Sequence, residues 1–136
     1  MDSLNIVSPS PNGKYAAYFD CSGEIRFGPL YYSLLVDNHS FGQRIFGDAH
    51  CWSQSSTFLA VQEWLTLDYS EGPITSLVII DLQQGREAAV ARVTKGFVVP
   101  ETFDDPILVY HTDHAGRTDQ HVTLDVMTIT EWRALA

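Results

Sequence analysis

A polar turn that leads into a short apolar segment occurs three times in this 136-residue chain. The first copy is residues 10–18 (SPNGKYAAY), the second is residues 53–61 (SQSSTFLAV), and a weaker third is residues 104–110 (DDPILVY). Each copy is followed by a second apolar segment; these are residues 33–37, 77–81 and 123–127. The first two copies lie 43 residues apart, and a period in the forties indicates a repeated β-unit. The sequence therefore predicts an all-β architecture.

Apolar and alternating segments between turn residues predict the individual strands. The expected strands are residues 15–19, 24–27, 30–36, 43–46, 58–65, 76–82, 87–93, 107–111 and 121–129. The cluster of residues 20–23 (DCSG) predicts a turn after the first strand. Thr130 is a suitable N-cap with good helix formers behind it, so we expect a short C-terminal helix over residues 130–135. No linker or change of composition divides the chain, which predicts a single domain over residues 1–136.

The repeat resembles the blade of WD-like β-propellers. Residues 10–18 match the strand entry S-P-D-G-k-x-l-A-y of such blades, and residues 52–61 are a degraded copy of it. Residues 34–37 and 78–85 are similar to the strand and turn that end a blade. Propellers close with roughly four to eight blades, whereas this chain has room for three. The resemblance therefore implies an open or three-bladed array, or a sandwich whose sheets share blade-like hairpins. An open array leaves strand edges that a dimer or a protein partner could cover.

The charge of the chain limits its partners. It carries 17 Asp and Glu against 8 Lys and Arg, a net charge of −9. Such a field repels phosphate backbones and anionic lipids, so we expect neither nucleic acid nor a membrane as partner. The net negative charge fits a basic protein or a cation as partner, or it serves solubility alone. The N-terminal residues show no secretory pattern, so a cytoplasmic location is expected, with Cys21 and Cys51 as free thiols.

The densest polar segment is residues 111–121, with three histidines and two aspartates. Imidazole and carboxylate groups suit zinc and other transition metals. If this segment is a strand and hairpin, His111 and Asp113 share one face, and His121 lies opposite them. The spacing matches no specific zinc motif, however, and the segment also fits a solvated hairpin loop. We therefore expect no metal and no cofactor.

The sequence contains no recognisable catalytic motif. A nucleophile must lie beside a base, but there is no G-x-S-x-G motif. His50 and Cys51 are neighbours whose side chains would point to opposite faces of a strand. Asp104 and Asp105 could supply paired carboxylates for acid–base catalysis, but they directly precede Pro106, and this pattern predicts a turn. The expectation is that the chain is not an enzyme.

In overall profile, a small acidic domain without catalytic residues is similar to the immunity proteins that protect bacteria from their own toxins. That resemblance implies a cytoplasmic protein that covers the basic active-site surface of a toxin, for example a nuclease. The residues expected to bind the partner are Trp64, Asp68, Tyr69, Glu71, Glu101, Asp104 and Asp105, the two aromatic residues serving as anchors. Trp64 could instead pack inward, with Tyr69 covering the turn. Two other functions stay open: a propeller-like scaffolding subunit, with or without homodimer formation, and a metal- or ligand-binding enzyme that uses residues 111–121.

Overall fold

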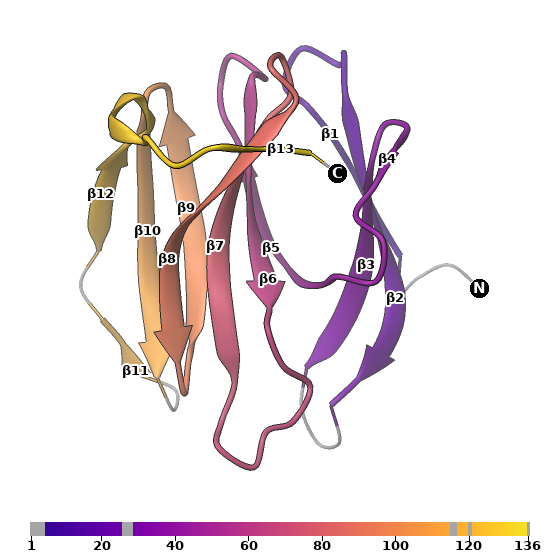
Figure 1. Ribbon diagram of the computed structural model, residues 1–136, viewed down its shortest axis with the longest axis vertical. Coiled ribbons are helices and arrows are strands. Elements are labelled where there is room, and N and C mark those ends of the chain that lie inside the picture. The colour runs from indigo at the N-terminus through magenta and orange to yellow at the C-terminus, as the bar shows by residue number, and fades with distance from the viewer. Residues whose placement is uncertain (1–4, 26–28, 115–116, 120, 136) are drawn as a thin grey trace.

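The fold is all-β. The computed structural model describes residues 5–25, 29–114, 117–119 and 121–135, and within these ranges it contains antiparallel strands and a single 3₁₀ turn (Figure 1). This confirms the all-β expectation. Among the described residues, none of the helical structure has the length and apolar composition needed to cross a lipid bilayer.

The elements are, in chain order, β1 (Ile6–Pro9), β2 (Ala16–Glu24), β3 (Leu30–Val36), β4 (His39–Ser40), β5 (Ile45–Trp52), β6 (Phe58–Trp64), β7 (Ile74–Asp81), β8 (Arg86–Thr94), β9 (Phe97–Asp104), β10 (Ile107–His114), β11 (Arg117–Thr118), β12 (Val122–Asp125), η1 (Val126–Thr128) and β13 (Arg133–Ala134).

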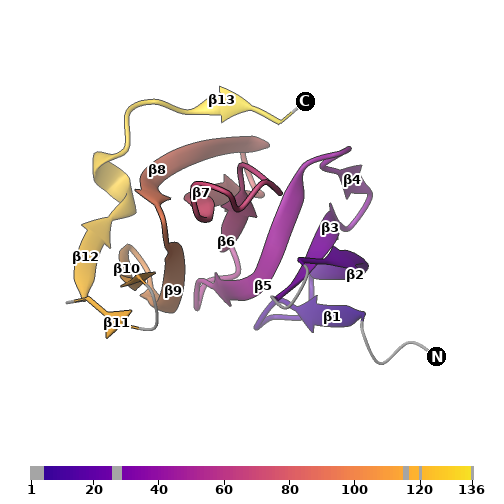
Figure 2. The same cartoon turned by 90° about the horizontal axis from the view of Figure 1, so that it is seen from below.

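The strands form three layers, which Figure 2 shows side by side. By their hydrogen bonds, β1 to β8 and β13 form one nine-stranded sheet. Its β1–β4 part is the first layer and its β5–β8 part is the second, while β9 to β12 form the third layer. The first two layers are joined by one residue pair, Tyr32 with Phe46, and β13 adds to the edge of β8. The third layer is a separate sheet in which β10 pairs with β9, β11 and β12.

The second layer is apolar on both faces because it lies between two cores. Leu59 and Val61 of β6 face the first core, between the first and second layers, whereas Ala60 faces the second core, between the second and third layers. β7 alternates in the same way, with Val78 in the first core and Leu77 in the second. A strand that is covered on both faces needs apolar residues at successive positions, which explains the continuous apolar runs of β6 and β7.

The first two copies of the sequence repeat form the same turn. In the first copy, the Tyr15 amide donates to Ser10 Oγ (3.0 Å) and the Ser10 amide donates to the Tyr15 carbonyl (2.8 Å). In the second copy, Ser53 and Phe58 make the equivalent bonds at 3.0 and 2.9 Å. The shared serine thus closes both turns and fixes the start of β2 and of β6.

The third copy occupies the equivalent place between β9 and β10, but it is a shorter turn around a cis Asp105–Pro106 peptide bond. The three turns lie in a row and are bonded to one another. The Asn12 amide donates to Ser56 Oγ (3.0 Å), and Ser55 Oγ donates to the Asp105 carboxylate. This row of turns ties the three layers together at one end.

The expected C-terminal helix is wrong, because residues 130–135 contain β13 and no helix. The Trp132 ring lies 6.5 Å from the ring of Phe58, and the Arg86 guanidinium lies 4.2 Å above it. These contacts and the pairing of Arg133 with Glu87 hold the backbone extended. Tertiary contacts thus override a modest helix propensity.

Other strand boundaries also differ from expectation. The turn predicted at residues 20–23 lies inside β2, where a bulge between Cys21 and Gly23 absorbs the irregularity. Part of the strand predicted at residues 24–27 lies outside the described residues. The strand expected at 121–129 ends at Asp125, whose carboxylate accepts from the Met127 amide (2.9 Å) and caps η1. β1 and β9 were not predicted.

Candidate functional site

The loop between β6 and β7, residues 65–73, is here called the acidic loop. Leu65 and Leu67 are 42% and 41% exposed, and Asp68 and Glu71 are exposed as well. The Ser70 amide donates to Asp68 Oδ1 (2.9 Å), which lowers the pKa of Asp68 and keeps it charged. The acidic loop therefore presents apolar and anionic groups together.

Trp64 lies beneath the acidic loop and not on its surface. It is 5% exposed, and its Nε1 donates to Gln62 Oε1 (2.8 Å). Its ring lies about 6 Å from those of Tyr31, Tyr69 and Phe97. The structure thus agrees with the inward alternative, and Trp64 is unavailable as a partner anchor. Tyr69 is half-buried against it and covers the turn.

The residues predicted to bind a partner are divided between two ends of the fold (Figure 1). Asp68 and Glu71 lie at the end of β6, whereas Asp104 and Asp105 lie with the row of turns at its beginning. β6 has seven residues, so its ends are about 20 Å apart at ~3.3 Å per residue. Glu101 lies on β9 between the two ends. One compact patch cannot include all of them.

Asp105 has a structural role. Its Oδ2 accepts from Ser55 Oγ, and its Oδ1 is buried without a hydrogen-bond partner among the described residues. Asp104, its neighbour, is exposed. The two adjacent carboxylates were both predicted to bind a partner, but only Asp104 is exposed, whereas Asp105 stabilises the turn.

Replacing each of these carboxylates separately should reveal the difference. Asp105→Ala is expected to lower the free energy of unfolding by about 1 kcal/mol, since it breaks the bond to Ser55 but also removes an unpartnered buried oxygen. Asp104→Ala should change it by less than about 0.5 kcal/mol. Urea denaturation measures both. Equal losses in the two variants would contradict the assignment.

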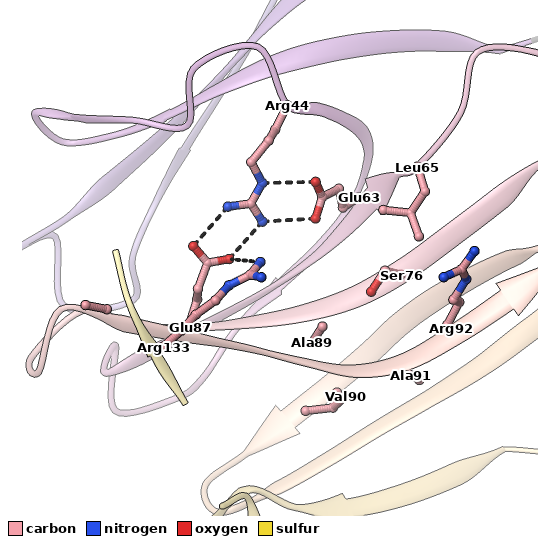
Figure 3. Close-up of a pocket in the computed structure, with 11 residues that line it drawn as sticks. Arg44, Glu63, Leu65, Ser76, Glu87, Ala89, Val90, Ala91, Arg92 and Arg133 are labelled. Atoms are coloured by element: carbon pink, nitrogen blue, oxygen red, sulfur yellow. Dashed lines mark hydrogen bonds and ion pairs between the residues drawn. The ribbon is translucent and has the colours of Figure 1, made fainter. Parts of the chain in front are cut away.

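A groove of about 830 Å³ lies over β6, β7 and β8, with β13 at one side of it (Figure 3). Its floor is made of small side chains, including Ala89 and Ala91, and Leu65 of the acidic loop lines it as well. β13 pairs only with Arg86 and Glu87. Among the described residues, the rest of the outer edge of β8 is therefore open.

One end of this groove is closed by four charged side chains. Arg44 binds Glu63 through Nε and Nη2 and Glu87 through Nη1 and Nη2, all at 2.8–2.9 Å. Arg133 lies 3.2 Å from Glu87. Burial raises the pKa of Glu87, but the two arginines outweigh it and hold that pKa below its usual value. The cluster ties the segment just before β5 to β6, β8 and β13, which gives it a structural role.

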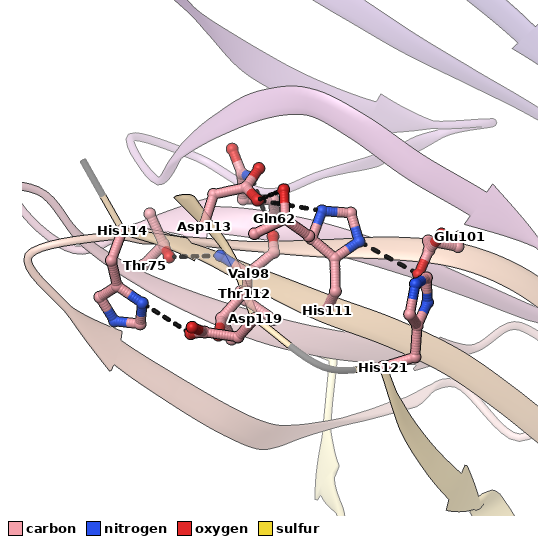
Figure 4. Close-up of polar contacts among 11 residues, drawn as sticks. Gln62, Thr75, Val98, Glu101, His111, Thr112, Asp113, His114, Asp119 and His121 are labelled. Carbon is pink, nitrogen blue, oxygen red and sulfur yellow. Dashed lines mark hydrogen bonds and ion pairs between the residues drawn. The ribbon is translucent and has the colours of Figure 1, made fainter. Parts of the chain in front are cut away.

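A second polar cluster lies on the third layer, here called the histidine cluster: Glu101 of β9, His111 of β10 and His121 just before β12 (Figure 4). One ligand atom from each lies within 4.8 Å of the other two. His111 Nδ1 is 3.1 Å from Glu101 Oε2, and His121 Nδ1 contacts the same oxygen. The expectation that His121 lies opposite His111 is confirmed, with ring centroids 5.8 Å apart. That Glu101 joins them was not predicted.

Within residues 111–121, the polar side chains outside the histidine cluster contact one another. His114 Nδ1 lies 2.8 Å from Asp119 Oδ2, and Thr118 Oγ1 donates to Asp113 Oδ1 (2.8 Å). Asp113 Oδ1 is also 3.3 Å from His111 Nε2. His111 and Asp113 therefore share a face, as predicted, while His114 belongs to a separate pair.

His50 and Cys51 are separated as the alternation of a strand requires. The His50 ring lies 4.6 Å from Phe19 in the first core, whereas Cys51 packs against the second core. Burial raises the pKa of the Cys51 thiol, which disfavours the reactive thiolate. The two residues form no nucleophile–base pair.

Comparison of the chain with protein-family models, curated proteins and solved structures gives no match.

Proposed function

We propose that the chain is a non-enzymatic protein-binding module, and specifically an immunity protein that neutralises a toxin by covering its basic active-site surface. The observation that carries the proposal is the acidic loop, where Leu65 and Leu67 are exposed next to Asp68 and Glu71. Interfaces combine apolar anchors, which supply affinity, with charges that direct the partner. The net charge of −9 fits a basic partner.

The structure beneath the acidic loop favours binding because it fixes the loop in advance. Trp64 is held by Gln62, and Tyr69 packs against Trp64. A loop that is ordered before binding loses less conformational entropy when the complex forms. The buried tryptophan therefore contributes to the proposed interface indirectly.

The proposed contact surface extends from the acidic loop into the groove along β8. Leu65 belongs to both, so a partner seated on the loop can also fill the groove over Ala89 and Ala91. Asp68 and Glu71 would face the basic residues of the partner. Opposite charge accelerates association, and this acceleration weakens as salt screens the charges.

The test is a pull-down from a lysate of the source cells, followed by affinity measurement with the purified partner. Leu65→Ser with Leu67→Ser should weaken binding at least 10-fold, because it removes the apolar anchors. Asp68→Lys with Glu71→Lys should slow association, and this effect should diminish at high salt. Asp104→Lys, an exposed carboxylate at the other end of the fold, is the matched control and should bind normally.

The outcomes separate the function from the surface. A basic partner that binds all variants equally would refute the acidic loop as interface. A purified, folded chain that captures no basic partner at low salt would refute the binding function itself.

A propeller-like scaffolding subunit is the second candidate. Val7 and Tyr18 are paired between β1 and β2 and are 63% and 36% exposed. On the third layer and in the η1 turn that follows it, Val122 and Met127 are 42% and 75% exposed. Apolar side chains on both outer layers suit a stack that continues into further layers, from a second copy or another protein. Stable self-association without a basic partner would favour this function.

A further inference from the structure

The histidine cluster has the composition of a metal site. Two imidazoles and one carboxylate are a ligand set that zinc and related divalent metals use in proteins. The three ligand atoms are within 4.8 Å of one another, and ligands bonded to one tetrahedral ion at ~2.0–2.1 Å are about 3.4 Å apart. A small adjustment of side chains would therefore let all three bind one ion.

The backbone aims Glu101 at the two histidines. In β9, Thr102 pairs with Val109 and Pro100 pairs with Tyr110, so Glu101 is an extra residue that forms a β-bulge. A bulge turns a side chain out of the regular alternation, and bulges are frequent beside functional sites. The irregularity in β9 thus has a consequence: it directs one carboxylate at the two imidazoles.

His111 is placed as metal-binding histidines are. Its Nδ1, the atom nearest Glu101, is buried and makes no aligned hydrogen bond. Its Nε2 lies 3.3 Å from Asp113 Oδ1, and Thr118 holds that carboxylate in turn. A ligating histidine usually gives its second nitrogen to such a carboxylate, which fixes the ring and leaves the first nitrogen free for the metal.

We propose that Glu101, His111 and His121 bind one divalent transition-metal ion, of which zinc is the expected one, and that Asp113 positions His111. The His121 side chain is 61% exposed, so the ion would lie at the surface with room for water at its remaining position. The net charge of −9 further favours a cation. This site is separate from the acidic loop and does not depend on the proposed binding of a partner.

Calorimetric titration of the EDTA-treated, purified chain with zinc chloride tests the proposal, together with metal analysis after dialysis. One zinc per chain is expected. His121→Ala should weaken zinc binding by more than about 100-fold, since it removes a ligand, and Asp113→Asn should weaken it by about 10- to 100-fold. Because His121 is largely exposed, its loss should leave the folded state intact, which circular dichroism checks.

His114→Ala is the matched control, because His114 is on the same strand but pairs with Asp119. It should bind zinc as the unaltered chain does. Absence of saturable zinc binding by the unaltered chain would overturn the proposal, as would His121→Ala binding zinc normally. Magnesium should not compete, because its preferred ligands are oxygens; equal affinity for magnesium would overturn the role of the imidazoles.

Discussion

Replacing Glu87 by glutamine is expected to lower the free energy of unfolding by about 3 kcal/mol, at the low end of the range for breaking a buried ion pair. Glu87 is 3% exposed and holds both Arg44 and Arg133. Glutamine has the same shape, but it lacks the charge and can accept at only one oxygen. Arg44 would keep Glu63 and is itself 27% exposed, which is why the loss should not be larger.

The same carboxylate should make stability depend on pH. The arginines depress the pKa of Glu87 in the folded chain, so the unfolded chain binds its proton more readily. This contribution is fully present above the unfolded pKa of about 4.3, and it is lost as the pH falls through the folded pKa. The difference in stability between the unaltered chain and Glu87→Gln should therefore be largest near pH 7 and shrink below about pH 4.

Urea denaturation at several pH values measures this difference. Glu71→Gln is the matched control, because Glu71 is exposed on the acidic loop, and it should change stability by less than about 0.5 kcal/mol. A loss for Glu87→Gln that persists unchanged at low pH would show that shape and packing, and not charge, account for it.

Much of the fold could be predicted from the sequence because its signals are local. The serine turns at residues 10 and 53 and the apolar runs of β6 and β7 carry their structure in a few adjacent residues. β9 was missed because Pro100 and Glu101 interrupt its alternation, and the reason for that interruption is the bulge opposite β10. The C-terminal segment was mistaken for a helix because its structure comes from Phe58 and Arg86, which are distant in sequence.

The candidate sites were predicted only in part, for the same reason. Asp68 and Glu71 were identifiable as loop carboxylates because the turn residues around them are adjacent. The inward position of Trp64 could have been predicted from the alternation of β6. Ala60, Gln62 and Trp64 are alternate residues and share one face of the strand, and that face is buried. Glu101 could be joined to the histidine cluster only once β9 was known, because the contact depends on a pairing between separate strands.

Gln62 links Trp64 to β9, and its replacement by leucine should lower the free energy of unfolding by about 3 kcal/mol. The side chain is 5% exposed. Its Nε2 donates to the Val98 carbonyl of β9 (2.8 Å), and its Oε1 accepts from Trp64 Nε1 (2.8 Å). Leucine is similar in volume, so it leaves little cavity, but it orphans one buried carbonyl and one buried indole N–H, each at about 1–3 kcal/mol.

The local environment offers an independent way to break the same bonds. A Cβ added at Gly47 would lie 2.0 Å from Gln62 Oε1 and 2.8 Å from Trp64 Nε1, so Gly47→Ala must displace the pair while leaving Gln62 in the chain. Both variants should lower the midpoint of urea denaturation, and both should change the tryptophan fluorescence as Trp64 is released. Gln84→Leu, on an exposed turn, is the control and should change neither. If Gln62→Leu retains full stability, the hydrogen bonds of Gln62 do not hold Trp64 beneath the acidic loop, and the loop is not fixed before binding in the way proposed.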